Sequence, residues 1–365
     1  MLPASYHDAH RYDGAVIQHN RRDTLVPCAV QPRDVAIVRD VWRYKFLTAP
    51  QLLELWWPDG VAWPGQRRLR KLFDAGYLER FRPLARRGSY PWTYHLGEAG
   101  HRLLQHAGLI TPTHRYHPRT IYDFGHVLHE LQLNAWVLAL RRAAGDALQA
   151  WHGELDITPP PGSRPELRLD DDWSAEDLRD PRARLLRPDA VLELARDNGD
   201  VRTILVEYDR TRRVDKNYEK FRRYDAFLCW WWRHTPYASA RKPPLVLFVC
   251  QAEGQRARFV TTADHELTGH RWHPNAAPEH DEYVGRTRIL FALEQDAHKG
   301  RLEAWQLPAF PPGHPARDVA VRRIRLTGRT AEPPATRASS RPRSSGPGRQ
   351  RSDRDLQPSR PDHRS

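Results

Sequence analysis

Apolar residues recur at helical spacing in residues 33–47, which predicts a helix with one apolar face. A second helix is predicted to begin after Thr48, whose hydroxyl can cap the first turn, and Pro50 lies in that turn. A third helix is predicted over residues 64–78, with Gly76 at its end. These segments predict a small helical module near the start of the chain.

The stretch after the third helix, LERFRPLARRGSYPWTYHL, predicts two strands joined by a basic turn. The order helix, helix, basic helix and hairpin is that of a winged helix-turn-helix. In such a module the third helix enters the major groove of DNA, and the wing reaches the backbone or the minor groove. We therefore expect a winged helix-turn-helix DNA-binding domain over residues 33–110.

Positive charge is concentrated in this module. Residues 33–96 hold twelve Lys and Arg against six Asp and Glu, while the whole chain has a formal net charge of +13 and a pI of about 9.9. The expected partner is double-stranded DNA, and the alternative is a winged helix that contacts protein, with a solvated arginine face. The side chains expected at DNA are Gln66, Arg67, Arg68, Arg70 and Lys71 on the third helix and Arg86 and Arg87 in the wing.

A second module is expected over residues 120–326. Its first helix is predicted at residues 126–143, where the apolar stripe is wide enough to pack on a sheet. An acidic, Pro-rich exposed loop is expected at residues 158–182, followed by two strands of a hairpin. Later apolar segments, including 245–250, are expected to complete the sheet as strands or as a strand and a helix. The predicted fold class is α/β (α+β), with a mixed sheet flanked by helices.

The register of the hairpin decides which carboxylates meet. A three-residue loop with Gly199 in the left-handed conformation pairs residues whose numbers sum to 396, and places Asp189 opposite Glu207. A two-residue turn would pair Asp189 with Tyr208 and send Glu207 to the other face. In the first register Asp189, Glu207 and Asp209 converge beside apolar residues, and oxygen ligands of this kind suit Mg²⁺ or Mn²⁺.

The run RPDAVLEL, ILVEYDRTRR and YEKFRRYDAFL resembles the PD-(D/E)XK nuclease superfamily, in which a PD hairpin and an E-x-K strand bind magnesium beside a helix. Asp189 matches the acid of the PD element and Glu207 that of E-x-K, but Asp209 stands where the superfamily usually has lysine. Lys220, four residues before Tyr224, could replace that lysine from the next helix. The resemblance thus implies catalytic roles for Asp189, Glu207, Asp209, Lys220, Tyr224 and Glu130, the first three as metal ligands. The alternative is a charged strand end whose acids pair with neighbouring cations.

The whole arrangement, from the winged helix to the K-x-x-x-Y helix, is similar to the replication-relaxation family of bacterial plasmids and mobile elements. This resemblance implies a role in plasmid replication or mobilisation, alongside other proteins of those processes. Two hypotheses follow. In the first, the chain is a Mg²⁺-dependent DNA endonuclease or nickase that hydrolyses a phosphodiester with water. In the second, it is a non-catalytic accessory factor or transcriptional regulator with a degenerate nuclease-like scaffold.

The remaining predictions concern the two ends of the chain, its cellular compartment and its tryptophan-rich segment. Residues 1–32 are expected to be a loosely ordered leader, and the Arg-, Pro- and Ser-rich residues 327–365 a disordered tail. Three well-separated cysteines and the lack of a signal peptide or a long apolar run favour a cytoplasmic protein without membrane contact. The tryptophans at 230–232 indicate either a contact surface, such as that of a homodimer, or part of the core.

Overall fold

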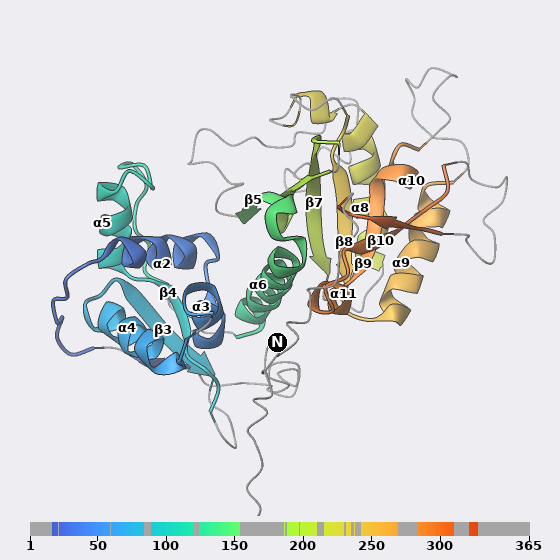
Figure 1. Ribbon diagram of the computed structural model, residues 1–365. Helices are drawn as coiled ribbons and strands as arrows, with labels where there is room; N and C mark the ends of the chain where they lie inside the picture. Colours follow the sequence, from blue (N-terminus) through green and yellow to red (C-terminus); the bar gives the residue numbers. More distant parts are fainter. Residues whose placement is uncertain are drawn as a thin grey trace, which may run out of the picture. The chain divides into compact units, whose positions relative to one another are not determined.

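The computed structural model describes residues 17–20, 22–58, 60–83, 89–119, 121, 124–153, 186, 188–196, 198–209, 215–229, 231–234, 237, 242–268, 283–309 and 321–327 (Figure 1). By internal contacts the chain divides into Met1–Arg329 and Thr330–Ser365, and every described residue belongs to the first of these units. This unit is a mixed α/β structure with two sheets flanked by helices, so the predicted fold class is confirmed.

The first sheet and its helices occupy the N-terminal part of the unit. The elements are β1 (Ile17–Asn20), α2 (Pro32–Arg43), β2 (Leu47–Thr48), α3 (Ala49–Trp56), α4 (Ala62–Asp74), β3 (Leu78–Pro83), β4 (Thr93–Leu96) and α5 (Glu98–His106). The strands form an antiparallel sheet in the order β1-β3-β4-β2. From α2 to β4 the elements follow the order expected for a winged helix-turn-helix.

Local sequence explains where the helices of this part begin and end. The Thr48 hydroxyl accepts a hydrogen bond from the Gln51 amide and thereby caps α3, as predicted. Gly76 follows α4 with a φ of +80°, a conformation that costs glycine little. Leu69 and Leu72 of α4 are fully buried beneath α2 and β3, so hydrophobic burial fixes which face of α4 turns outward.

The second sheet has seven strands in the order β11-β10-β9-β8-β7-β6-β5. The central pairs β7-β8 and β8-β9 are parallel, and the outer pairs are antiparallel. The strands are β5 (Leu148–Gly153), β6 (Ala190–Ala195), β7 (Val201–Asp209), β8 (Leu245–Cys250), β9 (Ile289–Leu293), β10 (Glu303–Gln306) and β11 (Arg322–Arg325). The helical segments of this part are α6 (Phe124–Ala144), η2 (Gly145–Ala147), α8 (Asp215–Cys229), η3 (Trp231–His234), α9 (Glu253–Glu266), α10 (Gly285–Arg288) and α11 (Glu294–His298).

Helices cover both faces of this sheet (Figure 1). Alternate residues of β7, such as Ile204 and Val206, pack in one cluster with Trp136 and other residues of α6. Leu205 of β7 packs on the opposite face with Phe221 of α8 and residues of α9. The near-continuous apolar run of the central strands therefore reflects a sheet that is buried on both sides.

Helix α6 also packs against the N-terminal part. The Asn134 side-chain amide donates hydrogen bonds to the carbonyls of Tyr44 and Phe46, at 2.9 and 2.7 Å. The Gln51 amide donates to the carbonyl of Leu131 at 3.2 Å. These bonds satisfy buried polar groups, and they tie α2 and α3 to the helix that covers the second sheet.

Several expectations need correction or lie outside the described residues. The expected irregular leader contains β1, which is recognisable only through its pairing with β3, because four residues carry too little pattern. Of the alternatives left open, residues 257–262, an apolar segment expected to be a strand or a helix, lie within helix α9, and Trp232 is buried in the core. The loop 158–182, the wing residues Arg86 and Arg87, and the tail beyond Thr327 lie outside the described residues. The three cysteines are free thiols. None of the described helices is long and apolar enough to cross a membrane.

Candidate functional site

The hairpin of β6 and β7 adopts the first of the two registers considered. Ala190 pairs with Val206 and Ala195 with Val201, so paired residue numbers sum to 396. Gly199 has a φ of +80°, as the three-residue loop requires. The next position along the ladder places Asp189 opposite Glu207 at the edge of the sheet where β7 and β8 end.

Glu207 is the centre of a hydrogen-bonded group. Its side chain is only 3% exposed, and each of its carboxylate oxygens has a donor from α8. The Lys220 ammonium donates to Oε2 at 2.6 Å, and the Tyr224 hydroxyl donates to Oε1 at 2.5 Å. Lys220 and Tyr224 are four residues apart, so they lie on one face of α8. The structure thus brings together three of the residues that the sequence singled out.

The charge of Glu207 controls the ionisation of its donors. Burial and the Glu207 charge raise the pKa of Tyr224 well above its ordinary value, so the hydroxyl keeps its proton. Burial acts to lower the pKa of Lys220, but its attraction to Glu207, the hydrogen bond between them and the charges of Asp189 and Asp209 together outweigh burial. The net pKa of Lys220 is raised, so the ion pair is maintained at neutral pH.

Asp189 is half-buried beside this group. Its Oδ2 accepts a hydrogen bond from the Tyr208 amide at 2.7 Å, and His129 Nε2 lies 3.9 Å from the same oxygen. Burial and the neighbouring Glu207 charge raise the pKa of Asp189 to about 8. Near neutral pH the Asp189 carboxyl is therefore protonated, and the pair Asp189 and Glu207 carries about one negative charge.

The expected metal ligands are not grouped as a metal site among the described residues. Among the described residues, no group of three or more His, Cys, Asp or Glu side chains is placed to hold a metal ion. Both oxygens of Glu207 already have hydrogen-bond donors. Glu130 lies on α6, against the other face of the sheet, where its Oε1 accepts a hydrogen bond from Lys45 at 3.1 Å. Metal binding by Asp189, Glu207 and Asp209 therefore stays a prediction.

Lys45 is a feature that sequence patterns did not reveal. Among the described residues, Lys45 is the non-glycine residue whose backbone φ is positive, at 58°. This conformation lies in the short link between α2 and β2, and it is uncommon for a lysine. The Lys45 ammonium is 10% exposed where it meets Glu130, so the N-terminal part supplies a cation to α6.

Helix α4 is the other candidate site. It buries Leu69, Leu72 and Phe73, and leaves Gln66, Arg67, Arg70 and Lys71 exposed. Arg67 lies over the ring of Trp63, 5.3 Å from its centroid, and Trp63 is 61% exposed at the start of the helix. The outer face of α4 thus presents cations, an amide and an aromatic ring to solvent.

Arg68 has a different environment from its neighbours on α4. Its guanidinium forms two hydrogen bonds with the carboxylate of Asp34, a fully buried residue in the first turn of α2. The Arg68 side chain is only 15% exposed. We therefore assign Arg68 to the core of this part and remove it from the expected DNA contacts. The sequence placed Arg68 outside because charged residues are usually exposed, and the buried Asp34 reverses that rule here.

Comparison with models of known protein families shows which family the chain is related to. The replication-relaxation family model matches residues 38–239, which is more than half of the sequence. The chain belongs to the replication-relaxation family. The matched region contains both α4 and the group around Glu207, and it ends before β8. Membership suggests a role in the replication of plasmids or mobile elements. No curated protein and no solved structure matches the chain.

Proposed function

We propose that this replication-relaxation protein binds duplex DNA in plasmid replication or mobilisation, with α4 as the helix that enters the major groove. The observation that carries the proposal is the outer face of α4. Arg67 and Lys71 lie one turn apart and are exposed, and Gln66 adjoins them. Arginine, lysine and glutamine are residues that hydrogen-bond to base edges and phosphates.

The rest of the N-terminal part supports this orientation of α4. The ion pair of Arg68 with Asp34 fixes the inner side of α4 against α2. Arg70 pairs with Asp74 at 2.9 Å and remains 61% exposed, so its charge is partly compensated within the helix. We therefore expect Arg67 and Lys71 to contribute more to phosphate binding than Arg70, since only free charge releases counterions on binding.

Fluorescence anisotropy with a labelled random-sequence duplex of about 30 base pairs tests the proposal. The variant Arg67→Gln/Lys71→Gln removes two charges from α4, and both side chains are exposed, so folding should be unchanged. If each cation meets a phosphate, the slope of log K against log salt should become shallower by about 1.8. The control Arg258→Gln/Lys299→Gln removes two exposed charges, one on α9 and one just after α11, and neither pairs with an acid in the described part of the chain.

The α4 variant and the control should differ clearly in their affinity for DNA. The proposal predicts weaker binding and a shallower slope for the α4 variant, with the control close to the wild type. Equal losses in both variants would show that α4 has no special part in binding. An absence of duplex binding by the wild type at low salt would also overturn the proposal.

Metal-dependent cleavage is a second candidate function, favoured by the register that sets Asp189 opposite Glu207 and by the ion pair of Glu207 with Lys220. Because no group of three such ligands is placed for a metal ion among the described residues, we assign no step to a cation. Supercoiled plasmid incubated with Mg²⁺ or Mn²⁺ tests this candidate beside Asp189→Ala/Glu207→Ala. Nicking by the wild type and not by the variant would support cleavage, and DNA that stays uncut while bound by both proteins would favour the non-catalytic alternative.

A further inference from the structure

A basic cavity lies at the edge of the second sheet opposite to Glu207. It has a volume of about 930 Å³ and is formed where β6 and β10 end and where β7, β8, β9 and β11 begin. Glu207 lies five residues along β7 from Arg202, which corresponds to roughly 17 Å. The cavity is therefore separate from the carboxylate group. Six cationic residues line it, namely Arg196, Arg202, Lys242, Arg288, Arg322 and Arg325.

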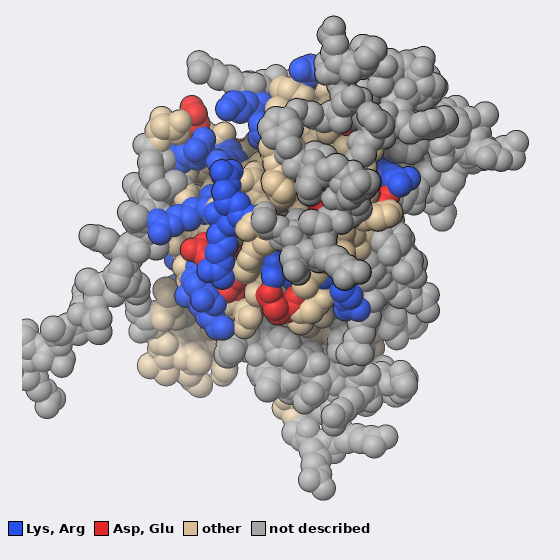
Figure 2. Space-filling view, turned by 90° about the vertical axis from the view of Figure 1, so that its right-hand side faces the viewer, with Lys and Arg blue, Asp and Glu red and all other residues tan. Residues whose placement is uncertain are grey.

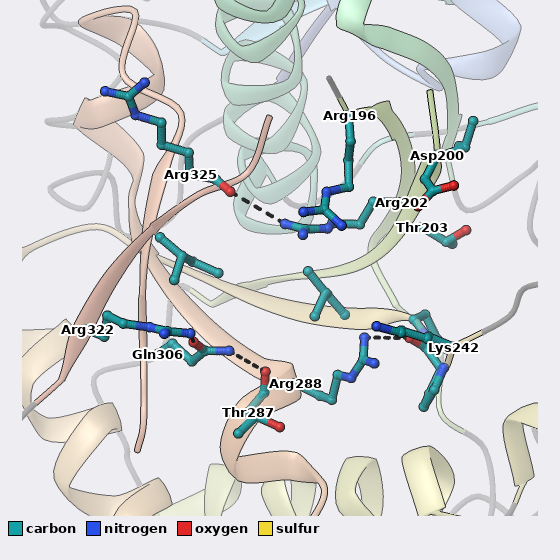
Figure 3. Close-up of a pocket in the computed structure, with 15 residues that line it drawn as sticks. Arg196, Asp200, Arg202, Thr203, Lys242, Thr287, Arg288, Gln306, Arg322 and Arg325 are labelled. Carbon is teal, nitrogen blue, oxygen red and sulfur yellow. Dashed lines mark hydrogen bonds between the residues drawn. The ribbon is translucent and has the colours of Figure 1, made fainter. Parts of the chain in front are cut away.

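The arginine side chains approach the cavity from more than one strand (Figure 3). Arg196 and Arg202 extend into it from β6 and β7, and Arg288 extends from the opposite side, near Lys242. Arg325 contributes its backbone carbonyl, which accepts a hydrogen bond from Arg202 at 3.4 Å, while its own guanidinium points away. Positive charge thus converges from segments that are far apart in the sequence.

These charges are not balanced by acids in the described part of the chain. None of the six cationic residues forms an ion pair with a described carboxylate, and the hydrogen bonds of Arg202 and Arg288 go to backbone carbonyls. Asp200 also lines the cavity, but its Oδ2 accepts a hydrogen bond from Asn198 within the hairpin turn.

The convergence of like charges has an energetic consequence. Burial, then the charges of Arg196 and Arg288, lower the pKa of Arg202. A lowered pKa means that the surroundings disfavour the charged guanidinium, although an arginine keeps its charge at neutral pH. An anion placed among these side chains would relieve the repulsion, so the cavity is suited to a ligand with several negative charges.

The lining indicates which kind of anion fits. The described lining residues include no aromatic side chain, whereas proteins that bind single-stranded nucleic acid stack bases on aromatic rings. Recognition here would rest on charge alone, as it does for the phosphates of a duplex, which carry one charge per ~1.7 Å of helix axis. Figure 2 shows that Lys and Arg side chains also gather in a band on one face of the molecule, with some Asp and Glu side chains beside them.

We propose that this basic cavity binds the phosphodiester backbone of duplex DNA, as a sequence-independent contact additional to α4. The inference rests on the proposed function in naming DNA as the polyanion, and it adds a second site on a different sheet. In this proposal the duplex contacts the edge of the second sheet that carries the cavity. The Glu207 group lies at the opposite edge.

The test measures binding of the full-length protein to the labelled 30-base-pair duplex over a range of salt concentrations. The variant Arg196→Gln/Arg202→Gln removes two charges that extend into the cavity. The control Arg258→Gln/Lys299→Gln removes two exposed charges from residues that do not line the cavity. We expect the cavity variant to bind at least tenfold more weakly at 0.1 M salt, with a slope shallower by about 1.8, and the control to differ little from the wild type. Unfolding midpoints in urea confirm that all proteins are folded.

Three results would overturn the inference, and they separate it from the proposed function. If the cavity variant matches its control while Arg67→Gln/Lys71→Gln binds weakly, α4 binds DNA and the cavity does not. If the cavity variant loses affinity only for a single-stranded oligonucleotide of the same length, the ligand is not duplex. If the wild type binds no duplex, both proposals fail together.

Discussion

Replacing Asp189 with asparagine should change how the stability of the protein depends on pH. The pKa of Asp189 is raised from 3.8 to about 8 by burial and by the Glu207 charge. Between these values the unfolded chain releases the Asp189 proton and the folded protein retains it. The free energy of unfolding therefore falls as pH rises through this window, because the folded state binds more protons. Asparagine has no proton to lose, yet its side-chain oxygen can still accept from the Tyr208 amide.

The magnitude follows from the size of the shift. One pKa unit corresponds to about 1.4 kcal/mol, so a shift of about four units corresponds to about 6 kcal/mol at most. The Asp189 side chain is 27% exposed, and solvent screening reduces this value. We expect the stability of Asp189→Asn relative to the wild type to increase by about 2 to 5 kcal/mol between pH 4 and pH 8.

Urea unfolding at pH 4, 5, 6, 7 and 8, in buffer with a metal chelator, measures this difference. Contributions from titrating groups that do not interact with Asp189 cancel between the two proteins, so the difference reports Asp189 together with its coupled neighbour Glu207. A difference that is the same at every pH would refute the reasoning, because Asp189 would then titrate alike in the folded and unfolded states.

Three further substitutions test the packing. Asp34→Ala leaves Arg68 without its buried partner and should lower the free energy of unfolding by about 3 kcal/mol in urea titrations; a loss below about 1 kcal/mol would show that the pair is not structural. Tyr224→Phe removes a donor from buried Glu207 and should cost about 1 to 3 kcal/mol in the same assay, whereas no loss would mean that the hydroxyl bond contributes nothing. Gly199→Ala places a side chain at a φ of +80° and should lower the melting temperature by a few degrees; an unchanged or higher value would contradict the loop geometry.

Features encoded over short stretches could be predicted from the sequence. Three such features are the Thr48 cap, the end of α4 near Gly76 and the register of the β6-β7 hairpin. Each depends on a few neighbouring residues with restricted conformations. The meeting of Glu207 with Lys220 could be anticipated because α8 follows β7 closely in the chain, so few geometries were available.

Features that depend on distant residues could not be predicted in this way. Arg68 has the pattern of an exposed helix residue, and only the fold shows that Asp34 lies beneath it. Lys45 reaches Glu130 across 85 positions of sequence, and its positive φ has no signature in a lysine. The basic cavity combines Arg196, just after β6, with Arg288 at the end of α10, and no local pattern reports their convergence.

Amide hydrogen exchange of the full-length protein, with and without saturating duplex DNA, tests the central claim most directly. We predict that DNA slows exchange in the peptide covering Ala62–Asp74, most strongly in its first half, where Gln66 and Arg67 lie. The α5 peptide, Glu98–His106, should be unchanged and serves as the internal reference. DNA binding with unchanged exchange throughout α4 would contradict the assignment of this helix as the DNA-binding element.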